Sequence, residues 1–298
     1  MSLTDQARTD APDSALAKLR KAYSGLNAKH LVTFLNTLIL VVAEWVYGGL
    51  GGYDRLFVSL GSCMATELVL SWFVLGSLPK SYLSPYISGI SLSLLLKPAH
   101  GLLWPFALGG FLAIASKYVL RYRGRHLWNP TNFSICVLLV TAAPVLTKLT
   151  HEWGNNAVAN LVIWSVGLIV IHRARLLHVT LSYVVAYFAF SALRAGISSE
   201  TRFWTEIGPI TGPMYQLFVF FMITDPPTVV RSFRGRIFVA VLIAAVEHSI
   251  RFGLDHDVTW LQSFAVAPAL FALCFVGPIA KSWDLRRAAL EARKAKQA

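Results

Sequence analysis

The sequence predicts an all-α, polytopic integral membrane protein with about ten transmembrane helices. Hydrophobic residues make up 55% of the 298 residues and charged residues only 14%, and the mean hydropathy is +0.56. A soluble domain carries roughly 25% charged residues, which cover its water-facing surface. In addition, apolar runs close to the roughly 20 residues of one bilayer crossing recur along the whole chain.

Ten apolar segments define the expected spans. Residues 1–29 precede them as a basic cytoplasmic segment, residues 30–282 form the transmembrane domain, and residues 283–298 form a basic cytoplasmic tail. The segments at 82–96 and 212–224 are short and contain Gly and Pro, so we expect two broken helices there. The ten segments are 31–49, 56–75, 82–96, 102–120, 131–149, 157–171, 176–197, 212–224, 237–250 and 260–280.

The basic residues predict the orientation. With ten spans and an inside N-terminus, 21 of the 27 Lys and Arg residues fall on the inner side and 6 on the outer side. Short loops rich in Lys and Arg stay in the cytoplasm, so we expect both termini on the cytoplasmic side of a bacterial inner membrane. The net charge of +12 then faces anionic lipid headgroups, and we expect no nucleic-acid partner.

The chain contains a candidate internal repeat. Ser84-Pro85 through Ser88-Gly89 opens the third segment, and Gly208-Pro209 through Thr211-Gly212 opens the eighth. Each half, about 30–150 and about 156–282, holds five expected spans. Because five is odd, the second half would enter the membrane in the opposite direction, which is an inverted-topology repeat with sites near the midplane.

The two turns are candidate ligand sites. A helix over 212–224 reaches only about 20 Å of the roughly 30 Å hydrocarbon core, so we expect non-helical backbone beside a polar cavity. A half-helix that starts at Thr211-Gly212 would direct free N–H groups and its positive dipole end into that cavity. The same reasoning applies to Ser88-Gly89. The alternative is a Pro-kinked helix without a ligand.

Charged side chains inside spans are costly and are functional candidates. Glu67 lies in the middle of the second segment, and Glu247-His248 lies late in the ninth. A proton or cation relay and a structural ion pair both remain open for them. The three cysteines have no CxxC spacing and are interpreted as small buried hydrophobes. No metal-binding motif is present.

The stretch from Gly212 to Arg236 resembles the signature of the membrane subunit family that contains RnfD and NqrB. Thr224-Asp225-Pro226, Thr228 and Gly235-Arg236 match its pattern, and Asn129-Pro130-Thr131-Asn132-Phe133 is similar to the corresponding motif of the first half. The similarity extends from about residue 30 to 282 and is greatest to the stand-alone branch, which includes membrane proteins of enediyne-type gene clusters.

The resemblance implies a five-plus-five inverted repeat and an electron-transport role with a bound flavin. In the family, FMN is attached to a Thr just before the short helix, and here that position is Tyr215. We therefore expect FMN or riboflavin held noncovalently, or a quinone, with Thr211, Gly212, Tyr215, Ser88, Gly89 and Asn132 as candidate cofactor-binding residues. Asp225 is expected to fix the turn into the next helix.

Three functions follow as hypotheses. The first is a redox subunit, of oxidoreductase type, that relays electrons beside other membrane or redox subunits. The second is a small-solute channel or transporter with the same inverted repeat, and the third is a cofactor-free structural or assembly subunit. An absorbance spectrum would separate them, because only the first carries a chromophore.

Overall fold

The computed structural model describes residues 28–146, 149, 156–197 and 202–297, and they are almost entirely helical. The residues before position 28, including most of the expected basic segment 1–29, lie outside this description. The only strands in the described part are β1 (Arg121–Tyr122) and β2 (Arg125–His126), which form a small antiparallel hairpin. The expected all-α class therefore agrees with the structure apart from this hairpin.

The described residues 28–141 form five main helices. Gly76, in the left-handed conformation with φ 65°, ends the second of them and donates its N–H to Trp72 O at 3.0 Å; a glycine adopts this conformation without strain. Asn129 begins the fifth by accepting the N–H of Asn132 at 3.0 Å, a favourable N-cap. The elements are α2 (Ala28–Tyr47), α3 (Tyr53–Leu75), α4 (Leu83–Leu95), η2 (Ala99–Gly101), α5 (Trp104–Val119) and α6 (Pro130–Thr141).

The second part, residues 157–297, contains longer helices and one broken one. α10 continues into η4, a π-helical stretch in which the N–H of Ile223 bonds to Phe218 O at 3.0 Å. Ser232 caps α11 by accepting the N–H of Gly235. The elements are α7 (Ala157–Ala174), α8 (Leu177–Ile197), α9 (Phe203–Ile207), η3 (Gly208–Thr211), α10 (Pro213–Leu217), η4 (Phe218–Met222), α11 (Phe233–Asp255), η5 (Thr259–Phe264) and α12 (Pro268–Gln297).

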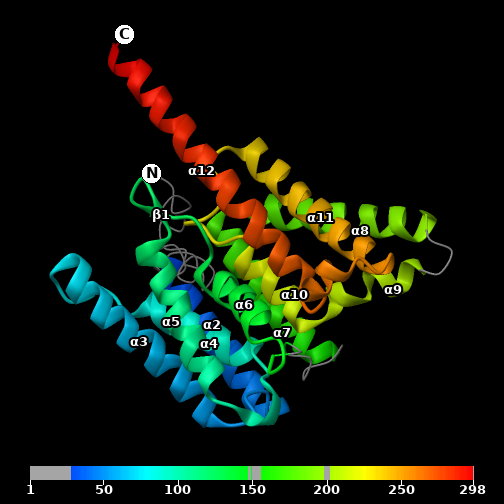
Figure 1. The fold of residues 1–298 in the computed structure, drawn as a ribbon, viewed down its shortest axis with the longest axis horizontal. Coiled ribbons are helices and arrows are strands. Elements are labelled where there is room, and N and C mark those ends of the chain that lie inside the picture. Colours follow the sequence, from blue (N-terminus) through cyan, green and yellow to red (C-terminus); the bar gives the residue numbers. More distant parts are fainter. Residues whose placement is uncertain (1–27, 147–148, 150–155, 198–201, 298) are drawn as a thin grey trace, which may run out of the picture.

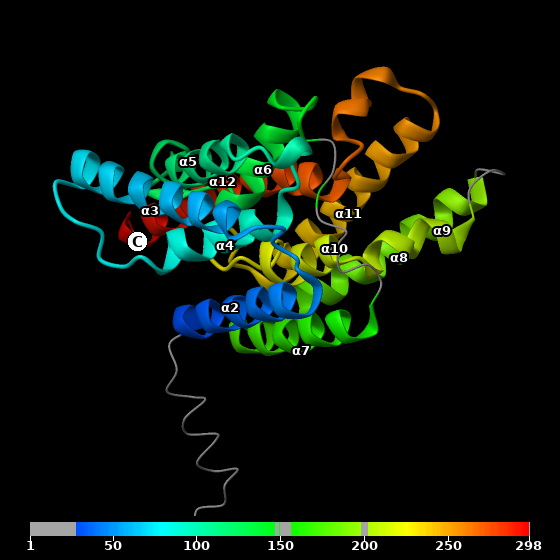
Figure 2. The ribbon, with the colours of Figure 1, turned by 90° about the horizontal axis from the view of Figure 1, so that it is seen from below.

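The helices pack as two groups that meet along two seams. In the first group α3 packs on α4 and α5, and α5 packs on α6; in the second, α8 packs on α11 and α11 packs on α12. The seams are α2 against α7 and α6 against α12, and Figure 2 shows α2 and α7 side by side along one edge. In Figure 1 the C-terminal part of α12 extends beyond the other helices.

Four helices in the described residues are long and apolar enough to cross a membrane, namely His30–Tyr47, Tyr53–Leu75, Leu177–Ile197 and Phe233–Asp255. Each of the ten expected segments overlaps a helix in the described residues, but several of these helices are too short to span a membrane alone. Leu83–Leu95, Pro130–Thr141 and Pro213–Met222 are among the shorter apolar helices. The structure thus establishes a helical protein with four candidate spans, fewer than the ten expected from apolar runs.

Three expected boundaries are wrong. The segment 260–280 is divided between η5 and α12, and α12 begins only at Pro268 and continues to Gln297. The segment 131–149 is helical only to Thr141, because Pro144 disfavours helical backbone at Ala143 and removes an N–H. The expected half-helix at Ser88-Gly89 instead starts at Leu83, so both residues lie inside α4. The second-half boundary is as expected, since Gly212 is the N-cap of α10.

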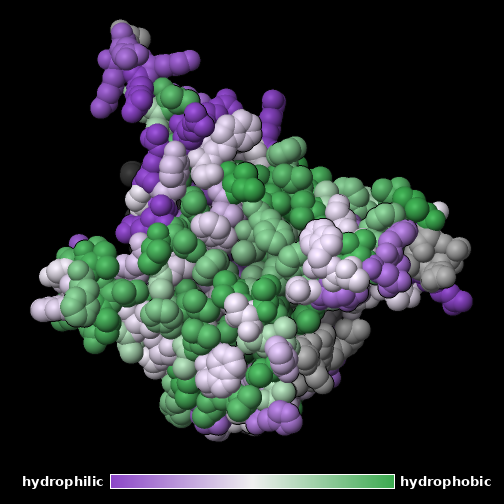
Figure 3. Space-filling view, in the orientation of Figure 1, coloured by the Kyte–Doolittle hydropathy of each residue, from purple (hydrophilic) through white to green (hydrophobic). Residues whose placement is uncertain are grey.

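The outer surface of the helices is strongly apolar. Figure 3 shows hydrophobic residues over the body of the molecule and hydrophilic residues gathered on the C-terminal part of α12. Trp45, Phe57, Phe73 and Val185 are all exposed, and apolar surface on this scale requires lipid or a partner. Only 17% of the apolar window of α3 is buried against the protein.

Basic segments from distant parts of the sequence meet at one end of the molecule. Arg231 pairs with Asp284 at 3.2 Å, and Lys281 Nζ donates to Val229 O at 2.6 Å. Burial, together with the positive charges of Lys117, Arg121, Lys281 and Arg125, lowers the pKa of His126 in the hairpin to about 4. Three of the segments expected on the inner side, namely the hairpin, the loop before α11 and the start of the C-terminal tail, thus lie together.

Candidate functional site

Glu247 provides a buried carboxylate at the centre of the second group of helices. It lies in α11 and is fully buried. Tyr183 of α8 donates to Oε2, and Tyr215 of α10 donates to Oε1. Arg251, one turn further along α11, donates Nε to Oε1 at 3.1 Å. Both carboxylate oxygens are therefore hydrogen-bonded, as a buried charge requires.

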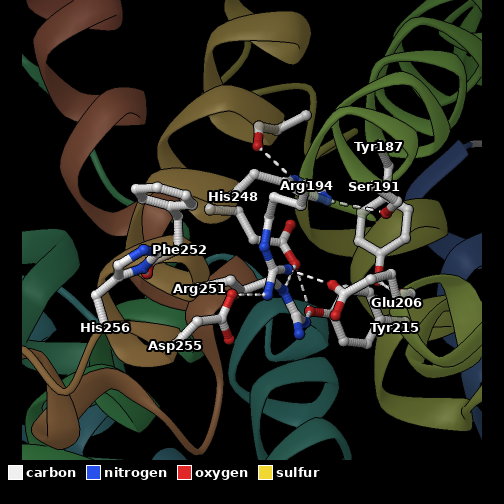
Figure 4. Close-up of polar contacts among 12 residues, drawn as sticks. Tyr187, Ser191, Arg194, Glu206, Tyr215, His248, Arg251, Phe252, Asp255 and His256 are labelled. Carbon is white, nitrogen blue, oxygen red and sulfur yellow. Dashed lines mark hydrogen bonds and ion pairs between the residues drawn. The ribbon is translucent and has the colours of Figure 1, made fainter. Parts of the chain in front are cut away.

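Tyr215 links the broken helix to this carboxylate. Its hydroxyl also accepts a hydrogen bond from Nη2 of Arg251, and Figure 4 shows Arg251 between Tyr215 and Asp255. Gly212, the N-cap, lies three residues before Tyr215. The position of this helix start therefore determines which residues of α11 Tyr215 contacts. Two residues singled out from the sequence, Tyr215 and Glu247, are therefore in direct contact.

A second ion-pair group lies along the same helices. Arg194 of α8 pairs with Glu206 of α9 and with Asp255 at the end of α11, the latter at 2.6 Å. Tyr187 donates its hydroxyl to Glu206 O at 2.9 Å. Figure 4 shows this group beside Arg251 and Tyr215. Together the two groups connect α8, α9, α10 and α11 through polar contacts.

His248 lies about one helical turn before Arg251 on α11 and contacts α8. Its Nδ1 lies 2.9 Å from Ala244 O, and its Nε2 lies 3.0 Å from Ser191 Oγ. A carbonyl can only accept, so Nδ1 carries a proton, and the Ser191 hydroxyl can serve Nε2 as donor or as acceptor. His248 thus joins α11 to α8, and it does not contact Glu247 through these bonds.

The turn at Thr211-Gly212 is held by its own hydrogen bonds. Thr211 Oγ1 donates to Gly208 O at 2.7 Å, and Gln216 Nε2 donates to Thr211 O at 2.7 Å and to Asn160 Oδ1 at 2.8 Å. Gly212 has φ −77°, which any residue adopts. A Cβ there would meet only Pro209 O, at 3.2 Å, so the backbone conformation of this turn does not depend on glycine.

The first-half turn serves helix packing. Ser59 Oγ of α3 donates to Gly89 O at 2.8 Å. A Cβ on Gly89 would lie 2.7 Å from Leu60 Cδ2 and 3.0 Å from Leu60 Cα. The absent side chain allows α3 and α4 to approach closely, as small residues do between membrane helices. Ser88 is buried beside it.

Glu67 forms a structural ion pair within the first group. Lys117 Nζ lies 2.7 Å from Glu67 Oε2, and the Tyr118 hydroxyl donates to Oε1 at 2.9 Å. Lys117 also donates to Ser84 Oγ at 3.1 Å. These contacts tie α3 to α5 and to the start of α4, which agrees with the structural alternative left open for this residue.

A cavity lies where the motifs of the two halves meet. The space free for a water-sized molecule is about 30 Å³, which holds roughly one or two waters. Its polar lining comes from Asn129, Asn132, Thr228 and Arg236. Apolar side chains provide most of the remaining wall, from Val179, Ile223, Val239, Ala240, Ile243 and Leu273.

Asn132 is the most informative residue of this cavity. Its Nδ2 donates to Leu270 O of α12 at 3.1 Å. Its Oδ1 is buried and has no hydrogen-bond partner among the described residues. Buried polar atoms are nearly always satisfied, so an acceptor left without a partner on a cavity wall fits a ligand or water that donates to it.

Asp225 lies in the loop between η4 and α11, next to this cavity. Its carboxylate accepts from Thr228 Oγ1 at 3.1 Å. Burial raises its pKa to about 6, although hydrogen bonds from Thr228 and Asn129 and the charge of Lys281 act in the opposite direction. These contacts connect the Thr224-Asp225-Pro226 and Asn129 motifs, as expected of a residue that fixes the turn.

The sequence reasoning did not find several of these contacts. Arg251 is one of the six Lys and Arg residues expected on the outer side, just past the ninth segment, although its i,i+4 spacing from Glu247 is a readable signal of an ion pair on one helix. Tyr183 gave no signal, because it lies in an apolar run on another helix. Among the described residues, no three His, Cys, Asp or Glu side chains gather as a metal site requires.

The fold and these sites define a helical protein with apolar helices suited to a membrane and with buried ion pairs between them. No protein-family model matches the chain. A search of the curated proteins finds no match either.

Proposed function

We propose that this chain is a membrane redox subunit that holds a flavin or a quinone in the cavity between its two halves and relays electrons. The observation that carries the proposal is the Asn132 Oδ1, a buried acceptor that has no partner among the described residues and belongs to a residue lining this cavity. Ligand pockets typically have mostly apolar walls with a few polar groups, and a bound ring would require the walls of this cavity to move apart.

The side chains that line the cavity suit a flat ring with a polar edge. The side chains of Val179, Ile243 and Leu273 offer apolar contact to a ring face. Asn132 Oδ1 would accept from a ring N–H or hydroxyl, and the guanidinium of Arg236 would donate to a ring carbonyl or an anionic group. A flavin or quinone supplies reversible electron transfer when bound, and FMN or riboflavin would be held noncovalently.

A five-plus-five inverted repeat supports this placement and belongs to the proposal. The packing of α3 on α5 corresponds to that of α8 on α11, and the packing of α5 on α6 corresponds to that of α11 on α12. In such a repeat α2 is equivalent to α7, and α6 is equivalent to α12. These are the helices that pack against each other in the two seams. Sites at such a repeat interface are typical of inverted-repeat membrane proteins.

The orientation is likewise part of the proposal. Arg121–His126, the loop before α11 and the start of the C-terminal tail gather at one end. We place this end, with both termini, on the cytoplasmic side of a bacterial inner membrane, because basic segments remain inside. Other redox subunits would supply and accept the electrons.

The test is the cofactor content of the purified protein. Absorbance and fluorescence spectra, followed by denaturation and extraction, would detect a noncovalent flavin or quinone. Asn132→Leu should lose the cofactor by at least about tenfold, since it removes both the free acceptor and its contact with α12. Ser134→Ala is the matched control, because Ser134 is buried on the same helix but bonds to Gly109 O at 2.6 Å.

The outcome separates the hypotheses. A cofactor that is present in the Ser134→Ala protein and lost from Asn132→Leu supports the redox subunit. A wild-type protein without flavin or quinone would refute the proposal and leave the channel and the assembly subunit. A cofactor retained fully by Asn132→Leu would exclude this cavity as its site.

A further inference from the structure

A second pocket, at the tip of the β1–β2 hairpin, shares no lining residue with the cavity described above. Its lining comes from Arg123, Gly124, Arg125 and His126 of the hairpin and from Pro227 of the loop before α11. The space free for a water-sized molecule is about 340 Å³, within the roughly 300–1,000 Å³ typical of small-molecule sites. Arg123 and Arg125 are exposed, so a ligand can reach both.

The hairpin turn holds these two arginines next to one aromatic ring. Arg123 and Gly124 have positive φ, 50° and 77°, as a tight two-residue turn of this kind requires. The guanidinium of Arg123 lies over the Tyr122 ring, with Cζ 5.5 Å from the ring centroid. Arg125 is the cross-strand partner of Tyr122, so its side chain leaves the same face of the hairpin. Arg121 stabilises the turn by donating Nη2 to Gly124 O at 2.6 Å.

The positive charge of this pocket is not neutralised within the described part of the chain. None of the ion pairs there includes Arg123 or Arg125. Asp284 of α12 pairs with Arg231 instead, at 3.2 Å. Burial and then four surrounding positive charges, among them Arg125, lower the pKa of His126. Guanidinium groups in such a positive field favour an anionic ligand.

The position of the pocket limits how a ligand can approach. Figure 1 shows the hairpin at the end of the molecule from which α12 extends, and Figure 3 shows hydrophilic surface at that end. A ligand therefore arrives from water or from the headgroup layer of a membrane. The hydrocarbon interior, which faces the apolar body of the molecule, does not reach this pocket.

We propose that the hairpin pocket binds the phosphate group of an anionic ligand. The planar guanidinium groups of Arg123 and Arg125 donate pairs of N–H bonds to the phosphate oxygens, an arrangement for which arginine is especially suited. The headgroup of an anionic phospholipid and a soluble phosphate compound share this chemistry, and basic pockets on membrane proteins are known to bind such headgroups. The inference does not depend on a cofactor in the cavity lined by Asn132.

The experiment measures the two sources of phosphate separately on the full chain. The protein is purified in a neutral detergent and freed of bound lipid. Native mass spectrometry counts bound phosphatidylglycerol, with zwitterionic phosphatidylcholine as the comparison, and equilibrium dialysis measures binding of radiolabelled inorganic phosphate. We expect binding in at least one arm. Retention of phosphatidylglycerol alone identifies a lipid headgroup, whereas binding of inorganic phosphate shows that the phosphate group suffices.

Double variants separate the pocket from the general charge of the protein. Arg123→Gln with Arg125→Gln should weaken binding by about tenfold or more, since the charge-assisted hydrogen bonds are lost. Arg293→Gln with Lys294→Gln removes two positive charges from the exposed end of α12 and should leave the affinity nearly unchanged. Arg123→Lys with Arg125→Lys keeps the charge but should still weaken binding about threefold or more, because an ammonium group lacks the planar fork.

Three results would overturn the proposal. In the first, the wild type retains neither phosphatidylglycerol above phosphatidylcholine nor inorganic phosphate. In the second, the Arg293 and Lys294 variant loses as much affinity as the glutamine variant of the hairpin, which would indicate a general charge effect. In the third, the lysine variant of the hairpin binds as well as wild type. A cofactor detected in the other cavity would leave the proposed function standing in each case.

Discussion

The carboxylate of Glu247 shows how a charge is kept inside an apolar protein. Two tyrosine hydroxyls and the Arg251 guanidinium donate to its two oxygens. Two charges removed from water cost several kcal/mol each, and close pairing with further hydrogen bonds offsets that cost. Glu247 and Tyr215 thus form one unit with Arg251 and Tyr183.

Removing one partner of the Glu247–Arg251 ion pair should destabilise the protein far more than removing both. Arg251→Leu leaves Glu247 buried without its counter-charge and should cost about 3–5 kcal/mol. The double variant Glu247→Leu with Arg251→Leu should recover much of that loss. Thermal unfolding in detergent measures both.

The exposed pair Arg287–Glu291 is the control for this prediction. It has the same i,i+4 spacing, and its side chains are 75% and 65% exposed, so Glu291→Leu should change the melting temperature little. A double variant no more stable than Arg251→Leu alone would contradict the ion-pair interpretation.

Asp225 gives the protein a pH dependence with a defined sign. Its pKa rises from 3.8 to about 6 on folding, so the folded state binds more protons than the unfolded state between these values. Stability from this group is therefore present at low pH and is lost as pH rises through this window. The free energy of unfolding changes by at most about 3 kcal/mol across this window, and by less if water reaches the carboxyl group.

Asp225→Asn should remove this pH dependence. The melting temperature of the variant relative to wild type should rise between about pH 4 and about pH 7. His126 responds oppositely, since its lowered pKa makes acidification destabilising, but it does so equally in both proteins and cancels in the comparison. A difference that stays constant with pH would show that the Asp225 pKa is not raised.

At the scale of the helices, close packing depends on single glycines. A Cβ on Gly110 of α5 would lie 2.9 Å from Ser62 Cβ and 3.1 Å from the backbone N of Cys63 on α3. The helices can approach this closely only because no side chain separates them. Ser62 Oγ also donates to Ala107 O at 2.6 Å across the same contact.

Gly110→Leu should separate α3 from α5. We expect a lower melting temperature and broader elution in size-exclusion chromatography, since backbone atoms must move to admit the side chain. Gly61→Leu is the matched control, because a Cβ on Gly61 of α3 meets no atom within 4 Å. Equal behaviour of the two variants would argue against the α3–α5 packing.

At the scale of the whole molecule, the basic end predicts the orientation in the membrane. In a background with all three cysteines replaced by serine, Arg202→Cys should react with a membrane-impermeant maleimide added outside intact cells. Arg123→Cys, in the basic hairpin, should react only after the membrane is opened. The physical reason is retention of Lys/Arg-rich loops in the cytoplasm, and the reverse pattern would overturn the orientation.

The sequence by itself located the helical segments, because hydropathy, caps and breakers act locally. Asn129 and Gly76 mark helix ends that are readable from neighbouring residues alone. The end at Thr141 was missed because an apolar run continues through Pro144, where backbone geometry, not polarity, stops the helix.

The sequence could nominate Glu67, Glu247 and Asn132 because polar groups stand out in apolar segments. Their partners were decided only by the tertiary structure. Apolar helices look alike on every face, so hydropathy does not tell which face meets which neighbour. The contacts of Glu247 with Tyr183, of Asn132 with Leu270, and of both halves around one cavity arise from interhelical packing between segments far apart in the chain.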